Sequence, residues 1–193
     1  PVKKLAMEHG IPVYQPTSLR KEEALEMLRE CAPDLIVVVA YGKILPLSVL
    51  NLPAKGCINV HASLLPRYRG AGPIQWSILK GETVTGVTTM YMAEGLDTGD
   101  MLLSASIPIG EEETADELHD RLSQLGASVL LETLDALEAG TLTPIPQDNS
   151  QSTYAPMLTR ELSQLDFSKD ARTIHNQIRG LSSWPAAQTT CQG

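Results

Sequence analysis

The 193-residue sequence predicts an α/β fold with a mainly parallel sheet, and three observations lead to this prediction. Residues 34–42 contain a continuous β-branched run, which is typical of a central parallel strand buried on both faces. Residues 114–139 carry leucine and valine at the spacing of a long amphipathic helix. Strands and helices alternate before that helix, and an antiparallel hairpin is expected near Val87 to Ile107.

The N-terminal third of the chain begins with a predicted helix over residues 2–9, which Gly10 ends. Residues 11–14 are expected to form an edge-type strand, because Pro12 cannot donate a ladder hydrogen bond. The remaining elements expected in this third are a helix over 20–31 capped by Ser18, the strand over 34–42, a short helix or turn over 44–50 and a strand over 56–61.

The rest of the chain begins with residues 63–72, a loop rich in Gly and Pro that carries two arginines and is called the arginine loop below. Thr114 and Glu117 fit a capping box at the start of the long helix. The other elements expected are a helix over 73–80 with Pro73 in its first turn, strands over 85–91 and 100–107, a polar linker from residue 144 and a helix over 170–179.

Composition excludes several classes of function. The net charge of −8 argues against a surface that binds nucleic acid over its whole area, although a local basic patch is compatible with it. Three cysteines without CxxC spacing indicate a reducing compartment and no structural zinc. The absence of a GxGxxG motif and of a P-loop weakens nicotinamide and ATP chemistry, and no apolar run reaches membrane-spanning length.

The strongest candidate site combines Asn59, His61 and Asp97. If residues 57–61 form a strand, its period of two places the Asn59 carboxamide and the His61 imidazole on one face. Asp97 follows 36 residues after His61 in a Gly-Leu-Asp-Thr-Gly-Asp segment. An amide that stabilises an oxyanion, an imidazole that moves a proton and a carboxylate that orients it suit acyl transfer. The alternatives are a histidine satisfied in the core and an ordinary tight turn.

The arginine loop offers a second candidate site. Arg67 and Arg69 flank Tyr68, and they are either solvated side chains or contacts for a phosphate or carboxylate, which the planar guanidinium suits. His9, His119 and His175 lie in predicted helices and are interpreted as surface or packing residues.

Several segments together resemble one known family. Residues 59–70, 86–88 and 95–100 are similar to the signature of the folate-dependent formyltransferases. Residues 69–76, 153–159 and 175–181, with Trp184-Pro185, resemble the members of that family that act on methionyl-tRNA. The resemblance covers nearly the whole chain.

The resemblance implies a Rossmann-like formyltransferase domain over residues 1–143 that lacks the family's first strand. A linker over 144–162 and the beginning of a C-terminal domain over 163–193 would follow, so a fragment of a longer protein is expected. The implied reaction transfers the formyl group of 10-formyltetrahydrofolate to the α-amine of initiator methionyl-tRNA, in a cytoplasmic, monomeric enzyme without a metal. The alternatives are a UDP-aminosugar formyltransferase and a folate-binding fragment without turnover.

The resemblance also implies a role for individual residues. Asn59, His61 and Asp97 would be catalytic, and Arg67 and Arg69 would bind tRNA. The residues implied to hold the folate are Val39, Ala40, Tyr41, Gly42, Ser63, Leu64, Leu65 and Pro66.

Overall fold

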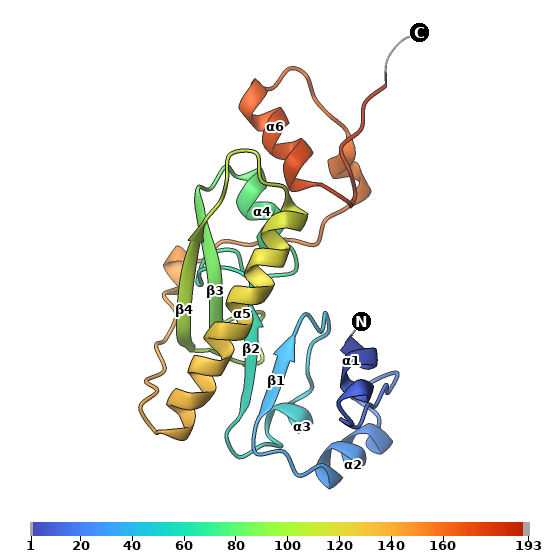
Figure 1. Ribbon diagram of the computed structural model, residues 1–193, viewed down its shortest axis with the longest axis vertical. Coiled ribbons are helices and arrows are strands. Elements are labelled where there is room, and N and C mark those ends of the chain that lie inside the picture. The colour runs from blue at the N-terminus through green and yellow to red at the C-terminus, as the bar shows by residue number, and fades with distance from the viewer. Residues whose placement is uncertain (1, 191–193) are drawn as a thin grey trace.

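A computed structural model describes residues 2–190 of the chain, and its helices and strands follow the predicted order except for the strand expected over residues 11–14 (Figure 1). The elements of the N-terminal part are α1 (Val2–Glu8), α2 (Glu22–Glu30), β1 (Ile36–Val39), α3 (Leu47–Leu50), β2 (Cys57–His61) and α4 (Pro73–Leu79). The later elements are β3 (Val84–Tyr91), β4 (Met101–Pro108), α5 (Ala115–Glu138), the 3-10 helices η1 (Asn149–Gln151) and η2 (Arg160–Ser163), and α6 (Ala171–Gly180). None of these helices combines the length and the apolar character needed to cross a membrane.

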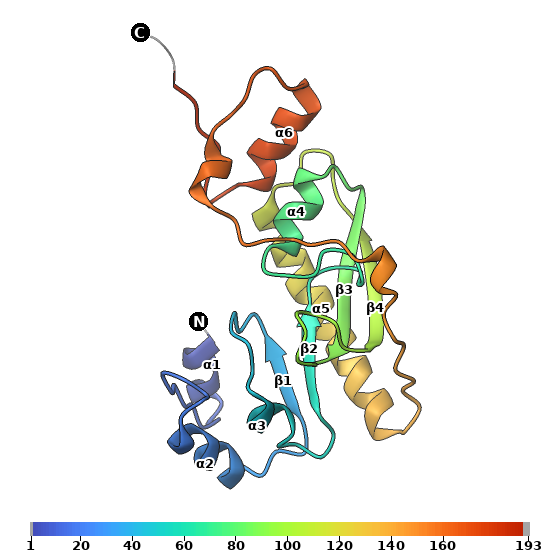
Figure 2. The same ribbon diagram turned by 180° about the vertical axis from the view of Figure 1, so that it is seen from behind.

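The sheet has the strand order β1-β2-β3-β4. β1 and β2 are parallel, with Val38 opposite Asn59, while β2 with β3 and β3 with β4 are antiparallel. The α/β class and the antiparallel hairpin are therefore confirmed, but the described part of the sheet is mixed rather than mainly parallel. The reason lies in the connection after β2, which passes through the arginine loop and α4 and brings β3 back alongside β2 in the opposite direction (Figure 2).

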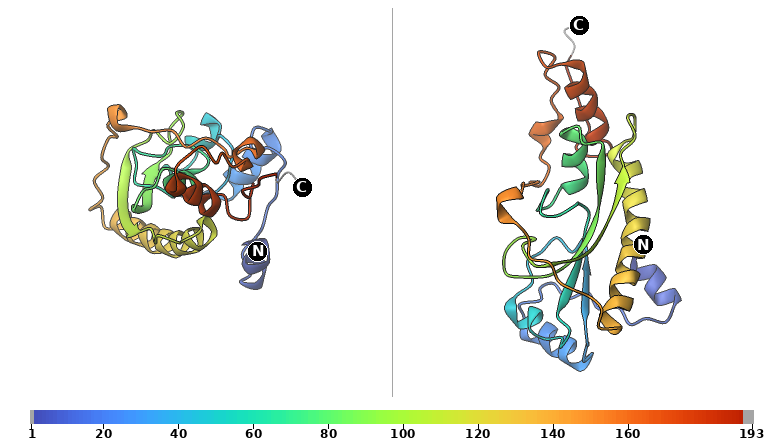
Figure 3. Two further views of the ribbon diagram at one scale, coloured as in Figure 1. Left: turned by 90° about the horizontal axis from the view of Figure 1, so that it is seen from above. Right: turned by 90° about the vertical axis from the view of Figure 1, so that its left-hand side faces the viewer.

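One face of β2, β3 and β4 is covered by α5, as two perpendicular views show (Figures 1 and 3). The predicted capping box at Thr114 and Glu117 is present at the start of this helix. Gly126 lets α5 approach β2 closely, because a Cβ built there would lie 3.2 Å from Val60 Cγ1. The core between α5 and the sheet contains Ile78, Val87, Ile109, Ala115, Leu118 and Leu122.

The first strand is less buried than its composition predicts. Val37 and Val39 are 39% and 60% exposed, so the prediction of burial on both faces is wrong for the described residues. Ile36 and Val38 point to the other face and pack against Leu25, Leu45 and Val49, a second apolar cluster supplied by α2, α3 and the segment just before α3. The difference arises because α5 lies against the other strands and leaves β1 uncovered. Residues 11–14, predicted as a strand, are irregular.

The segment predicted as a linker lies against the domain, and residues 144–156 are called the return segment below. Ile145 pairs with Met101 through backbone hydrogen bonds of 2.8 and 2.9 Å. Tyr154 forms a bridge with Arg69 in the arginine loop. Farther on, α6 packs against α4, and the buried Arg179 guanidinium donates to the carbonyl oxygens of Gly110 and Glu113.

Candidate active site

Asn59 and His61 lie on the face of β2 that points away from α5. Val60, between them, packs into the cluster beneath α5, and alternation along the strand directs its two neighbours to the opposite face. The register with β3 places Met90 opposite Asn59 and Thr88 opposite His61. The shared face predicted from the strand period is therefore present at the carboxyl end of β2.

The His61 imidazole is held on both sides and is only 6% exposed. Its Nε2 lies 2.9 Å from the carbonyl oxygen of Tyr68, and since a carbonyl only accepts, Nε2 carries a proton. Its Nδ1 lies 3.7 Å from Asp97 Oδ2, an ion-pair distance longer than a hydrogen bond. The Tyr68 carbonyl thus fixes the tautomer, and Nδ1 is the ring nitrogen left for proton exchange beside a carboxylate.

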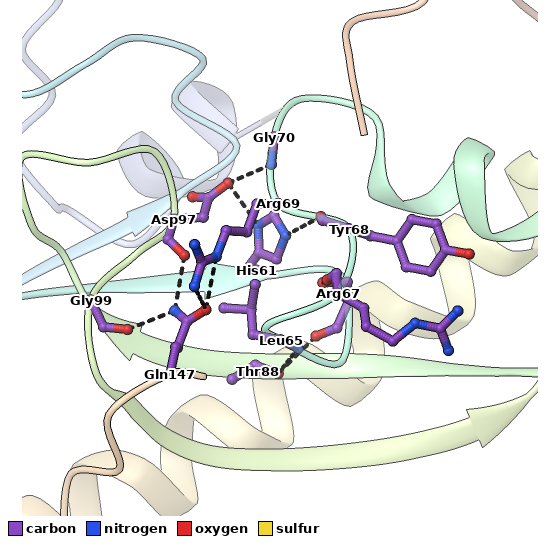
Figure 4. A network of polar contacts seen from close by, with 11 residues as sticks. His61, Leu65, Arg67, Tyr68, Arg69, Gly70, Thr88, Asp97, Gly99 and Gln147 are labelled. Carbon is purple, nitrogen blue, oxygen red and sulfur yellow. Dashed lines mark hydrogen bonds and ion pairs between the residues drawn. The ribbon is translucent and has the colours of Figure 1, made fainter. Parts of the chain in front are cut away.

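Asp97 is positioned by its surroundings on the turn between β3 and β4, which is called the aspartate loop (residues 94–100) below. Its backbone has φ +50°, a left-handed conformation that is uncommon for non-glycine residues and that Asp adopts more often than most. Its Oδ2 accepts a hydrogen bond of 2.7 Å from the backbone N–H of Gly70 (Figure 4). The arginine loop and the aspartate loop are therefore joined directly beside His61.

The Asn59 carboxamide is partly exposed and makes no side-chain hydrogen bond to any other residue in the range 2–190. A carboxamide N–H in this position can donate to a ligand without first breaking an internal bond. Asn59 thus supplies a free donor on the strand face that also carries His61. This pair can stabilise negative charge on an oxygen atom bound between them.

Thr88 is a supporting residue that the sequence did not single out as functional, although residues 86–88 were part of the resemblance. It is fully buried, and its hydroxyl donates to the Ser63 carbonyl at 2.7 Å and accepts from Leu65 N–H at 3.2 Å. The Ser63 hydroxyl in turn donates to the Arg67 carbonyl at 2.7 Å. These bonds fix the first half of the arginine loop against β3, next to His61.

The two arginines of the loop are held differently, and neither is simply solvated. Arg67 pairs with Glu82, which also accepts a 2.6 Å hydrogen bond from the Tyr68 hydroxyl. Burial, and then the hydrogen bond to Glu82, raise the pKa of the Tyr68 phenol above its usual range, so it remains a donor at neutral pH. Arg69 donates instead to the neutral side chains of Gln147 and Asn149, which do not offset its charge.

The residues implied to hold a folate fall into two groups. Val39, Ala40, Tyr41 and Gly42 are exposed at the end of β1, and Tyr41 borders cavities of about 320 and 220 Å³. Ser63 and Leu65 are buried, at 1% and 7% exposure, while Leu64 and Pro66 are partly exposed. The two groups begin at neighbouring strand ends, since Val39 pairs with Val60. Within residues 2–190 no group of three His, Cys, Asp or Glu side chains is arranged to hold a metal.

Comparison with known proteins defines the class. A family model described as "Formyl transferase" matches residues 1–134, and one described as "Formyl transferase, C-terminal domain" matches residues 157–193. The chain belongs to the formyl transferase family.

Individual relatives carry more specific names. The methionyl-tRNA formyltransferase of Trichlorobacter lovleyi is 58% identical over 193 residues, which are 100% of this chain and 61% of that protein. The methionyl-tRNA formyltransferase of Alkaliphilus oremlandii is 56% identical, over 100% of this chain and 62% of that protein. The chain thus spans about three fifths of the length of the curated relatives that it matches.

Solved structures share the fold at lower identity. HypX from Aquifex aeolicus, crystallised with tetrahydrofolic acid, matches with a TM-score of 0.75 and 24% identity over 86% of this chain and 28% of its own. A sugar N-formyltransferase from a Shewanella species matches with a TM-score of 0.78 and 22% identity over 96% of this chain and 74% of its own.

Proposed function

We propose that the protein to which this chain belongs transfers the formyl group of 10-formyltetrahydrofolate to the α-amine of initiator methionyl-tRNA. The observation that carries the proposal is the free Asn59 carboxamide beside a His61 ring whose Nδ1 faces Asp97. Membership of the family and identities of 56–58% with proteins named for this reaction support the choice of substrate. The enzyme would act in the cytoplasm, as a monomer, without a metal.

The chemistry requires one bond to form and one to break. The amine of methionyl-tRNA attacks the formyl carbon, and the carbonyl oxygen becomes an oxyanion that accepts hydrogen bonds from Asn59 and from the protonated Nδ1 of His61. Collapse of this intermediate breaks the bond between the formyl carbon and N10 of the folate. Asp97 accepts the proton that the amine loses, and His61 donates its Nδ1 proton to N10, which leaves as a neutral secondary amine. The proton on Asp97 then returns to His61.

The binding surfaces follow from the placement of the two loops. The folate would lie at the ends of β1 and β2, against the exposed backbone and side chains of residues 39–42 and the arginine loop. Ser63 and Leu65 would shape that loop from beneath, since both are buried. Arg69, whose charge is not offset by its amide partners, and Arg67 would meet the tRNA backbone.

The domain division is part of the same proposal. The proposed division has a catalytic domain over residues 1–143, a connecting segment over 144–162 and the start of a C-terminal domain over 163–193. The family matches, which end at residue 134 and resume at residue 157, support a division between two domains in this region. The return segment would belong structurally to the catalytic domain, because its residues contact both loops of the site.

The test is direct. The full-length protein is incubated with 10-formyltetrahydrofolate and methionyl-tRNA, and the aminoacyl group is analysed by mass spectrometry for the mass of one formyl group. Parallel incubations replace the tRNA with a UDP-aminosugar. Formylmethionyl-tRNA is the expected product. A formylated sugar would favour the aminosugar reaction, and folate binding without either product would indicate a binding protein.

A further inference from the structure

Gln147, in the return segment, uses its whole hydrogen-bonding capacity at the edge of the site (Figure 4). Its Nε2 donates to the carbonyl oxygens of Asp97 at 2.9 Å and Gly99 at 2.7 Å. Its Oε1 accepts from Nε and Nη2 of Arg69 at 2.9 and 2.7 Å. The carbonyls only accept and the guanidinium only donates, so the orientation of the amide is fixed by its partners.

These bonds complete a closed ring of contacts through the site. Gln147 holds the backbone of the aspartate loop on one side and the Arg69 side chain on the other. The next residue after Arg69, Gly70, donates its N–H to the Asp97 carboxylate. Asp97 is therefore held twice, by its backbone through Gln147 and by its side chain through Gly70.

This ring of contacts matters because His61 does not itself hold Asp97 in position. The 3.7 Å separation between His61 Nδ1 and Asp97 Oδ2 is too long for a hydrogen bond. The Asp97 backbone is in the left-handed conformation, with φ +50°, which Asp adopts more readily than most residues and which a hydrogen bond to its carbonyl oxygen supports. Gln147 supplies that support from a position 50 residues farther along the chain.

We propose that Gln147 is a positioning residue that sets the distance between Asp97 and His61 and couples it to the Arg69 side chain. Its part in turnover rests on the proposed formyl transfer, whereas the mechanical coupling does not. A second residue in the same segment provides a matched control. Asn149 also accepts a hydrogen bond from Arg69, at 2.9 Å, but makes no hydrogen bond to the aspartate loop in the described structure.

The experiment compares the variants Gln147→Met, Gln147→Glu and Asn149→Ala in the full-length protein. Methionine keeps the length and loses every hydrogen bond, whereas glutamate keeps the acceptors for Arg69 and loses both donors to the aspartate loop. Both Gln147 variants should lower kcat for formyl transfer about 10-fold or more, because a small misplacement of reacting groups is costly. The KM for folate should change less than about twofold, and Asn149→Ala should leave kcat within about twofold of wild type.

A further readout separates positioning from a loss of stability. Hydrogen exchange of the Gly70 amide and of the aspartate loop, measured without substrate, should accelerate in these variants and not in Asn149→Ala. Gln147→Glu guards against misfolding, since it keeps the Arg69 contact, and a cooperative thermal melt confirms its fold.

Each outcome has one meaning. Wild-type protein that does not formylate methionyl-tRNA would refute the proposed function, while the exchange data would still test the coupling. An active wild type together with an unchanged kcat in the Gln147 variants would overturn the positioning role. A loss of kcat without faster hydrogen exchange would refute the idea that Gln147 acts through the aspartate loop. An equal loss of kcat in Asn149→Ala would assign the effect to Arg69 alone.

Discussion

The loops that follow β1 and β2 begin at neighbouring strand ends but differ in how they are held. Residues 39–44, at and after the end of β1, are all exposed. The arginine loop after β2 is bonded to Thr88 in β3 and to the return segment, including a 2.8 Å hydrogen bond from Tyr68 N–H to the Thr153 hydroxyl. Its backbone also meets the aspartate loop through Gly70.

The difference in how the two loops are held corresponds to two different tasks at the same edge of the sheet. Groups that stabilise a transition state act best when their geometry is fixed before the substrate arrives. A surface that receives a large, partly apolar ligand needs access instead, and Val39 and Tyr41 are 60% and 40% exposed. On the proposed function, substitutions on the β2 side should therefore reduce kcat, and those on the β1 side should raise the KM for folate.

The largest effect is expected from Asn59 and His61, the two residues on the face of β2 that points away from α5. Asn59→Ala or His61→Ala should reduce kcat by about 10²–10³-fold, because each removes a donor to the oxyanion. His61→Gln is the control for stability, since its amide can still donate to the Tyr68 carbonyl but cannot take up a proton. Single-turnover formylation of methionyl-tRNA measures the loss. Near-normal turnover in any of these folded variants would remove that residue from the mechanism.

The next effect concerns charge beside the imidazole. Asp97→Asn keeps the size of the side chain and its acceptor for Gly70, and removes the negative charge. A fall in kcat of about 10²-fold is expected, with the folate dissociation constant changed far less. A kcat close to that of wild type would remove Asp97 from the mechanism.

A substitution in the backbone of the arginine loop tests whether the rigidity itself matters. A Cβ at Gly70 would lie 2.6 Å from the Ala155 carbonyl oxygen and 2.8 Å from the Tyr154 ring, at a φ of +116°. Gly70→Ala should displace the N–H that holds Asp97 and lower kcat about 10-fold. Gly140→Ala is the matched control, because Gly140 has φ +67° and nothing within 4 Å of the added Cβ. It should lower the melting temperature without changing kcat, and an equal loss of kcat in both would contradict the argument.

The smallest effect is expected in the exposed segment at the end of β1. Tyr41→Ala should raise the KM for 10-formyltetrahydrofolate up to about 10-fold, the loss expected for one aromatic contact, while kcat stays within about twofold. Tyr14→Ala provides the comparison, since Tyr14 is 56% exposed and borders neither cavity near Tyr41. Steady-state kinetics at saturating tRNA distinguishes the two parameters. A fall in kcat alone would place Tyr41 with the catalytic groups.

The sequence predicted those features that local rules decide. The period of β2 placed Asn59 and His61 on one face, and the spacing of Thr114 and Glu117 identified a capping box that the structure contains. The exposure of Val37 and Val39 was not predictable, because it depends on which strands α5 covers. The contribution of Gln147 was also hidden, since it arises from a contact with Arg69 across 78 residues and no local pattern distinguishes it from a polar linker residue.

The return segment limits how the chain can be recombined with its relatives. The family matches end at residue 134 and resume at residue 157, so a chimera joined between them keeps every residue that the family signature recognises. A crossover before residue 147 would nevertheless take Gln147 and Thr153 from one parent and the loops they hold from the other. The residues that must come from one parent to keep the site intact therefore extend to about residue 156, beyond the end of the sheet and its covering helix.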